Sequence, residues 1–93
     1  MTNGERDLGG LERVLKACAN KRRLGILRHL KKAKESAVGD IAHAIKLSFK
    51  ATSKHLAILN AAGLVEREQR NVQMFYTLSK NLPAPAHSII TLL

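Results

Sequence analysis

Lysine and small hydroxyl side chains are concentrated in the first half of the stretch LSFKATSKHLAILNAAGLV, which covers residues 47–65. Lysine ammonium groups and serine hydroxyls can hydrogen-bond to phosphate oxygens or to the edges of bases. Short side chains also let a helix backbone approach a groove closely. The second half of the stretch is apolar, and no acidic residue occurs between Ile41 and Val65. The stretch therefore predicts a cationic surface for a polyanion, carried on a helix with an apolar anchor.

The whole chain is strongly basic, with a net charge of +9 over 93 residues. A surplus of this size favours nucleic acid as the partner, and an anionic membrane surface second. No apolar run approaches the roughly 18 residues that a membrane span needs. The first ten residues lack the apolar core of a signal peptide. We expect a single cytoplasmic domain with no membrane association.

Residue sets for catalysis or metal binding are missing from the sequence. The one cysteine, Cys18, allows neither a disulfide framework nor a four-thiolate zinc site. The four histidines form no pair spaced as metal ligands, and a zinc site usually needs four ligands. No nucleophile with a base, glycine-rich phosphate loop or pair of carboxylates in an apolar setting is visible. We therefore expect neither an enzyme nor a cofactor, metal or small-molecule ligand.

The elements that must position the cationic stretch can be predicted from apolar spacing and caps. Asn20 is a predicted helix N-cap, because its side chain can accept from the free amides of the next turn. A helix is expected on each side of it, and the second leads into a solvated basic connection at residues 31–34. The first helix has apolar residues three and four apart along one face. They are Leu8, Leu11, Val14, Leu15 and Cys18.

Two helices joined by a tight turn are predicted over about residues 38–62. Ser48 is expected to cap the second of them, and Gly63 to end it, because glycine tolerates positive φ. The joining turn of about three residues around Lys46 is typical of a helix-turn-helix.

On a helical wheel, the helix that starts after Ser48 separates into a buried and an exposed face. Phe49 has two interpretations: it contacts a thymine methyl, or it packs against the preceding helix. A plain amphipathic helix with solvated lysines is the alternative for the whole element, and the flanking elements disfavour it. The predicted buried residues are Thr52, Leu56, Leu59 and Ala62. The predicted exposed residues are Lys50, Ser53, Lys54 and Ala57.

A β-hairpin is predicted over about residues 64–78, with its tip at residues 69–71, where Asn71 tolerates the left-handed conformation. A last short helix is expected over about residues 84–93. The fold class is therefore mainly α with a small β-hairpin, in the order of a winged helix-turn-helix. Residues 1–7 are expected to form a flexible tail before a single domain of residues 8–93.

Three segments resemble ArsR-type (arsenical-resistance repressor) winged helix-turn-helix transcription regulators. They are LKACANKRRLGILRHL at 15–30, VGDIAHAIKLSFKATSKHLAILNAAGLVE at 38–66 and VQMFYTLS at 72–79. Members of this family are homodimers that bind operator DNA. The resemblance implies that Lys50, Ser53 and Lys54 face DNA and that Arg67 and Arg70 flank the wing. With the residues of the cap and the turn added, the predicted DNA-binding set is Lys46, Ser48, Phe49, Lys50, Ser53, Lys54, Arg67 and Arg70.

The sequence departs from the family pattern at its metal sites and in its turn. The family's Cys-Val-Cys metal motif aligns with Ala37, Val38 and Gly39, so both thiolates are missing. After Glu68 there is no acidic residue for the second family metal site. The turn often has glycine where this chain has Lys46. We therefore expect no metal sensing through the third helix.

The first and last helices each present an apolar stripe that a domain of this size covers only in part. A helix of about two turns is marginal alone and needs something to pack on. We expect a two-fold homodimer in which these helices bury each other. Redox sensing would be an option if two Cys18 thiols met across the axis. The predicted interface residues are Leu8, Leu11, Leu15, Cys18, Ile89, Ile90 and Leu93.

These features predict a dimeric regulator of transcription, interpreted as a repressor, that binds double-stranded DNA. The alternative is a winged-helix module that binds RNA or a protein partner. The cationic face of the helix after Ser48, which would enter a DNA groove, argues against a purely protein partner. An A-form major groove is too narrow for a helix, and the chain has only three aromatic residues for stacking on bases.

Overall fold

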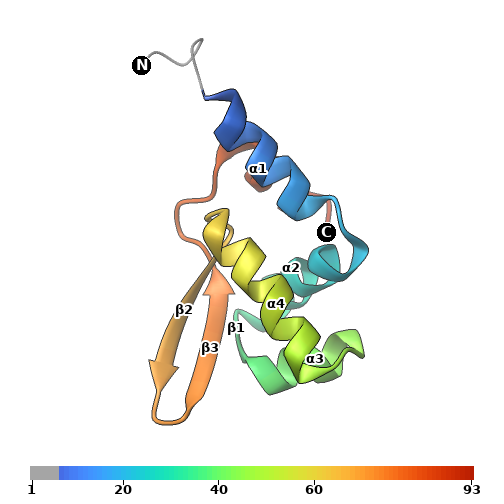
Figure 1. The fold of residues 1–93 in the computed structure, drawn as a ribbon, viewed down its shortest axis with the longest axis vertical. Helices are drawn as coiled ribbons and strands as arrows, with labels where there is room; N and C mark the ends of the chain where they lie inside the picture. Colours follow the sequence, from blue (N-terminus) through green and yellow to red (C-terminus); the bar gives the residue numbers. More distant parts are fainter. Residues whose placement is uncertain (1–6) are drawn as a thin grey trace.

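The computed structural model describes residues 7–93 and contains five helices and three strands within them (Figure 1). Residues 1–6 of the predicted tail lie outside the described residues. Asp7 does not belong to a tail, because its carboxylate accepts from the amide of Gly9 at 3.0 Å and caps the first helix. The elements are α1 (Leu8–Cys18), α2 (Lys21–Ala33), β1 (Glu35–Ala37), α3 (Val38–Ile45), α4 (Phe49–Ala61), β2 (Val65–Arg70), β3 (Gln73–Leu78) and α5 (Ala84–Thr91).

The predicted helix boundaries at Asn20, Ser48 and Gly63 are confirmed. The side chain of Asn20 accepts from the amide of Arg23, and that of Ser48 accepts from the amide of Ala51, each at 3.1 Å. Gly63 has a φ of 78°, the left-handed conformation in which glycine carries no steric penalty. These caps are local in sequence, which explains why they could be predicted.

The predicted connection at residues 31–34 is wrong. Helix α2 continues through this segment to Ala33 and ends at Lys34, which has a φ of 71°. Strand β1 follows at once and was not predicted. Its three residues pair with β3 in antiparallel register, with Ser36 opposite Tyr76. A strand this short has no alternating pattern of its own, so only its partner defines it.

The hairpin tip is shorter than predicted. Gln69 pairs with Met74 and Arg70 pairs with Gln73, so the β2–β3 ladder includes two of the three residues assigned to the tip. The chain reverses at Asn71, whose φ of 56° is the predicted left-handed conformation. The sheet has the order β1-β3-β2, and both of its pairings are antiparallel.

One hydrophobic core holds the helices and the sheet together. The phase predicted for α4 is confirmed, because Thr52, Leu56 and Leu59 are all fully buried, with 0% exposure. The core has contributions from α1, α2, α3, α4, β2, β3 and α5. Its largest fully buried apolar side chains are Ile26, Leu27, Leu30, Ile41, Leu56, Leu59, Leu64 and Val65.

Helix α2 connects the other helices through its cations. Arg22 donates to the carbonyl of Ile45 at 3.1 Å, at the end of α3. Arg23 donates to the carbonyl of Ala17 at 2.6 Å, at the end of α1. Lys31 donates to the carbonyl of Ile90 at 3.2 Å, at the end of α5. Cations stabilise helix C-termini, where carbonyls lack partners and the helix dipole is negative. Three helix ends are thus fixed to one helix.

The molecule has two distinct ends. Helices α1 and α5 pack against each other at one end, while α3, the start of α4 and the tip of the β2–β3 hairpin lie at the other (Figure 1). This separation keeps the cationic stretch of α4 away from the helices predicted to form a dimer.

Candidate nucleic-acid interface

The first two turns of α4 present the cationic stretch to solvent. Lys50 and Lys54 are exposed, and Ser53 is half-buried. The opposite side of the helix carries Leu56 and Leu59 in the core. The helix is therefore fixed to the body by its apolar side, and its lysines are free to contact a ligand.

The N-terminal end of α4 adds a hydroxyl and an aromatic ring to this surface. The oxygen of Ser48 accepts the capping hydrogen bond, which leaves the hydroxyl proton available for donation. Phe49 is 61% exposed, so it does not pack into the interior against α3. This exposure leaves most of the ring available to a ligand, and its contact with a thymine methyl stays a prediction.

Lys46 occupies the turn between α3 and α4 in the left-handed conformation, with a φ of 57°. This conformation costs a lysine about 1 kcal/mol relative to glycine. Arg22 stabilises the turn, because its guanidinium donates to the carbonyl of Ile45 and lies 3.5 Å from that of Lys46. The side chain of Lys46 is exposed beside the start of α4. The turn thus adds a cation to the surface at the cost of local strain.

The two wing arginines differ in their surroundings. Arg67 is exposed on β2. Arg70 is paired with the carboxylates of Glu35 and of Glu68, the latter at 3.1 Å, and lies 4.4 Å from the centre of the Phe75 ring. Its charge is therefore partly neutralised within the chain. Arg67 is the wing cation that a phosphate can reach without competing with a carboxylate.

The carboxylates of the described residues are almost all engaged away from α4. Glu66 accepts from the hydroxyl of Ser79 and the amide of Lys80. Glu12 pairs with Lys16 at 3.6 Å on α1. Helix α4 itself contains no acidic residue. The positive potential of its exposed face is therefore not cancelled locally.

His55 holds α4 in place from its inner side. Its Nδ1 lies 3.1 Å from Nη1 of Arg23 on α2. Burial lowers the pKa of His55, and the positive charges of Arg23 and Arg22 lower it further. The ring is therefore held neutral, and its Nδ1 accepts from Arg23.

A metal centre finds no support in the described residues. Within residues 7–93 no group of three or more His, Cys, Asp or Glu side chains comes together. Cys18 is only 4% exposed, and burial raises the pKa of its thiol while Arg23 partly lowers it. A buried thiol with a raised pKa is a poor nucleophile, which disfavours redox sensing. The prediction that the chain binds no metal stays a prediction.

The predicted dimer residues fall into three groups. Leu8 and Leu15 are 76% and 46% exposed on α1, although both are large and apolar. Leu11, Ile89 and Leu93 are half-buried. Cys18 and Ile90 are buried within the chain, because α1 packs on its own α5. Only the first two groups of side chains retain surface that a partner could cover.

Two exposed features were not predicted. Val72 at the hairpin tip is 95% exposed, and Leu92 at the end of α5 is 85% exposed. Leu92 lies off the apolar stripe that contains Ile89, Ile90 and Leu93, and Val72 lies in the turn before β3. Among residues 7–93, no helix combines the length and apolar character that crossing a membrane requires.

Comparison with known proteins agrees with this geometry. Residues 20–67 match the family model described as bacterial regulatory protein, arsR family. The chain is 46% identical over 66 residues to the transcriptional activator HlyU of Vibrio cholerae. The aligned segment covers 71% of this chain and 60% of that protein. It is 35% identical over 77 residues to the arsenical resistance operon repressor of Escherichia coli. That aligned segment covers 83% of this chain and 66% of that protein.

A solved structure shows the same fold. It is described as the homodimeric winged helix-turn-helix DNA-binding domain of Mb0332 from Mycobacterium bovis. The two chains are 31% identical with a TM-score of 0.79, and the match covers 98% of this chain and 85% of the other. The fold is therefore a winged helix-turn-helix, as the sequence predicted.

Proposed function

Because the chain belongs to the ArsR family of bacterial regulatory proteins, we propose that it is a transcription regulator that binds double-stranded DNA through α4. The observation that carries the proposal is the exposed, acid-free face of α4, opposite fully buried leucines. A major groove admits a helix whose outer side chains are short and cationic. DNA binding is a more specific explanation of this face than general solvation is.

Lys50 and Lys54 are proposed to contact phosphates or base edges from the major groove. Lysine contacts to phosphates release counterions and provide affinity, whereas contacts to base edges provide specificity. Ser48 and Ser53 would add hydroxyl contacts. Phe49, with its exposed ring, is placed to touch a thymine methyl.

The turn and the wing are proposed to contact the DNA backbone on either side of α4. Lys46 is exposed beside the N-terminus of that helix. Arg67 would reach a phosphate or the adjacent minor groove. Arg70 would contribute only after exchanging a carboxylate for a phosphate, because Glu35 and Glu68 already hold it.

The active species is proposed to be a homodimer formed through α1 and α5. Leu8 and Leu15 support this, since they leave apolar surface uncovered on α1. Leu11, Ile89 and Leu93 would extend the interface along its edges. A two-fold axis makes the interface isologous and would place two copies of α4 about 34 Å apart, one turn of DNA.

Residues 8–93 are proposed to form one DNA-binding domain, with the helix-turn-helix at about 38–62, the wing at about 64–78 and a dimerisation helix at about 84–93. The aligned relatives include an activator and a repressor. This chain spans 60% of the length of the first and 66% of the length of the second. We propose that the protein lies in the cytoplasm with the DNA. We also infer that it represses transcription, because a dimer bound to an operator blocks access to that stretch of DNA.

Selection of bound sequences from random duplex DNA tests the proposal. Recovery of an inverted repeat is expected, with half-sites about one helical turn apart. Recovery of unrelated sequences, or of single-stranded RNA in a parallel selection, would contradict it.

Leu15→Asp tests the dimer separately, by sedimentation and by affinity for the selected site. For sedimentation alone, Ile58→Asp is the matched control, since Ile58 is 45% exposed and Leu15 is 46% exposed, but Ile58 lies on the proposed DNA helix α4. The Leu15 variant is expected to be a folded monomer with weaker DNA binding. A Leu15 variant that remains dimeric would place the interface elsewhere.

A further inference from the structure

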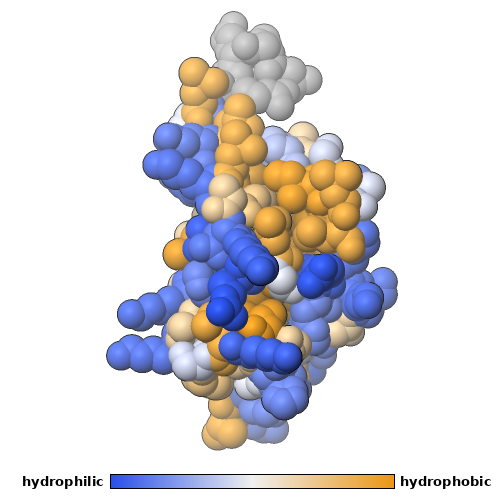
Figure 2. All heavy atoms as spheres, turned by 90° about the vertical axis from the view of Figure 1, so that its right-hand side faces the viewer, coloured by the Kyte–Doolittle hydropathy of each residue, from blue (hydrophilic) through white to orange (hydrophobic). Residues whose placement is uncertain are grey.

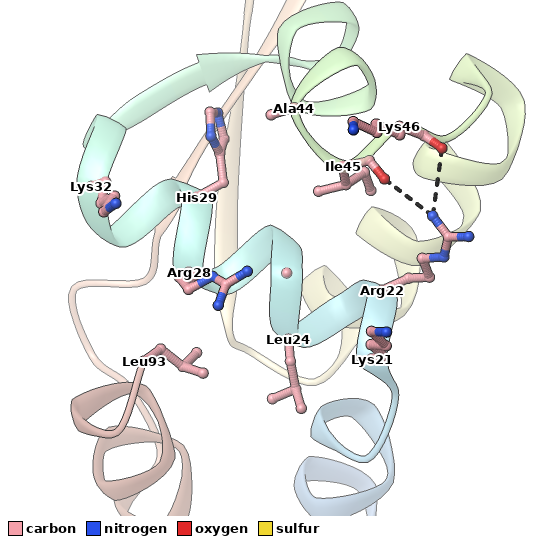
Figure 3. A pocket seen from close by; sticks show the side chains of 11 residues that line it. Lys21, Arg22, Leu24, Arg28, His29, Lys32, Ala44, Ile45, Lys46 and Leu93 are labelled. Carbon is pink, nitrogen blue, oxygen red and sulfur yellow. Dashed lines mark hydrogen bonds between the residues drawn. The ribbon is translucent and has the colours of Figure 1, made fainter.

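A basic groove lies between α2 and the end of α3, and it shares Lys46 with the proposed DNA contacts. It encloses about 830 Å³. The residues that line it come from α2, from the end of α3 and from the C-terminus, and Figure 3 shows Ala44, Ile45 and Lys46 above α2, with Leu24 and Leu93 below it. They are Lys21, Arg22, Leu24, Arg28, His29, Lys32, Ala44, Ile45, Lys46 and Leu93, with Gly25 beside them.

The lining combines positive charge with apolar surface and contains no acidic residue. Lys21, Arg28 and Lys32 are separated by seven and four residues, which places them along one face of α2. Between these cations, the absence of a side chain at Gly25 leaves a hollow in which a methyl group would only touch Ile45. Figure 2, which faces the right-hand side of Figure 1, shows hydrophilic side chains surrounding a hydrophobic area at the level of α3.

The cations of α2 differ in what they do, and one of the groove's own cations, Arg22, has a structural hydrogen bond. Arg22, Arg23 and Lys31 hold the ends of neighbouring helices. Within residues 7–93, neither Arg28 nor Lys32 is paired with a carboxylate. These two exposed cations therefore have no structural role that accounts for them.

We propose that this groove binds an amphipathic organic anion, with its carboxylate or comparable acid group on the basic rim and its apolar body over Leu24, Gly25 and Ile45. The volume lies within the range of about 300–1,000 Å³ that is usual for small-molecule sites. An inorganic anion would make no apolar contact with Leu24, Gly25 and Ile45, which form the apolar floor of the groove. A DNA backbone would also leave it unused, because a phosphodiester chain offers the floor no apolar group.

A ligand in this groove would act on the DNA-binding turn through Arg22. The guanidinium of Arg22 lines the groove and holds the carbonyls of Ile45 and Lys46 (Figure 3). An acid group that draws the guanidinium of Arg22 toward the ligand would lengthen the bonds of Nη1 to those carbonyls, and it also reduces the positive charge beside Lys46. The ligand therefore weakens DNA binding. This consequence rests on the proposed function, whereas binding of the anion itself does not.

The binding test uses the free protein without DNA and compares three probes by calorimetry and by amide NMR. The probes are decanoate, decyltrimethylammonium as the cation of matched chain length, and inorganic phosphate as the anion without an apolar body. We expect saturable binding of decanoate, below its micelle concentration, with shifts centred on Leu24, Gly25 and Ile45. Equal binding of the cation, or of phosphate alone, would overturn the proposal, as would no binding of decanoate.

Charge reversal locates the site. Arg28→Glu with Lys32→Glu is expected to weaken decanoate binding by about tenfold, the loss of two exposed charge contacts and their replacement by repulsion. Arg13→Glu with Lys80→Glu has the same change in net charge outside the groove and should leave decanoate affinity unchanged. Equal effects of the two pairs would place the ligand elsewhere. Weaker DNA binding by the groove pair, with decanoate affinity unaffected, would assign the groove to DNA.

Discussion

Nη1 of Arg23 on α2 lies 3.1 Å from Nδ1 of His55 on α4. The same guanidinium donates to the carbonyls of Ala17 at 2.6 Å and Lys16 at 3.2 Å. One arginine thus links the end of α1 to the inner side of α4. Because Nδ1 must accept, the neutral ring carries its proton on Nε2. The proposed dimer helix and the proposed DNA helix are therefore joined by a bond that depends on the protonation of His55.

Acidification should destabilise the fold through this bond. The folded-state pKa of His55 is lowered from 6.5 by burial and by the two arginines. Its contribution to the free energy of unfolding is therefore complete above pH 6.5 and decreases as the pH falls toward the lower, folded-state value. Urea denaturation at pH 8 and pH 5 measures the loss. The variant His55→Asn retains an acceptor near the position of Nδ1 but does not titrate, so its loss should be smaller. Equal losses would show that other groups cause the pH dependence.

Lys50→Ala and Lys54→Ala should weaken DNA binding while the chain stays folded, because both side chains are exposed. Each lost phosphate contact should reduce the slope of log affinity against log salt by about 1. Fluorescence anisotropy over a salt series gives the slope, and circular dichroism reports the fold. Lys80→Ala, with the same change in charge, is the control. An unchanged slope together with relaxed sequence preference would assign the lysine to a base edge instead.

Glu68→Gln should strengthen DNA binding. The change removes a negative charge from the wing and releases part of the hold on Arg70, whose pairing with Glu68 measures 3.1 Å. The expected gain is several-fold, on the order of the 0.2–1 kcal/mol that exposed charge pairs contribute. Glu12→Gln is the control, since its side chain on α1 is 66% exposed and that of Glu68 is 69% exposed. Weaker binding by the Glu68 variant would mean that the carboxylate positions Arg70 for DNA.

Thr52→Val should stabilise the protein. The hydroxyl oxygen of Thr52 is buried and has no hydrogen-bond partner among the described residues. Leaving such a group unpaired costs roughly 1–3 kcal/mol, so we expect a gain of about 1 kcal/mol in the free energy of unfolding. Urea denaturation measures it. Thr52→Ala also removes the hydroxyl but leaves a small cavity, so it should be less stable than the valine variant. A destabilised valine variant would show that the hydroxyl is hydrogen-bonded in solution.

The sequence by itself determined the features that depend on neighbours within a few residues. The caps at Asn20 and Ser48, the left-handed glycine at Gly63 and the buried face of α4 all follow from such local relationships. A helix places residues three and four apart on the same side, so the order of its residues determines which of them form its inner and outer faces. The exposure of Lys50 and Lys54 was predictable for this reason.

Only the tertiary structure decided the features that join distant segments. Strand β1 exists because β3 lies beside it, and Arg70 is neutralised by Glu35, which is 35 residues away in the chain. Within the apolar stripe of the last helix, Ile90 is buried where α5 packs on α1, whereas Ile89 and Leu93 are only half-buried. Periodicity assigns a residue to a face of its helix. The packing of the whole chain decides whether another segment covers that face.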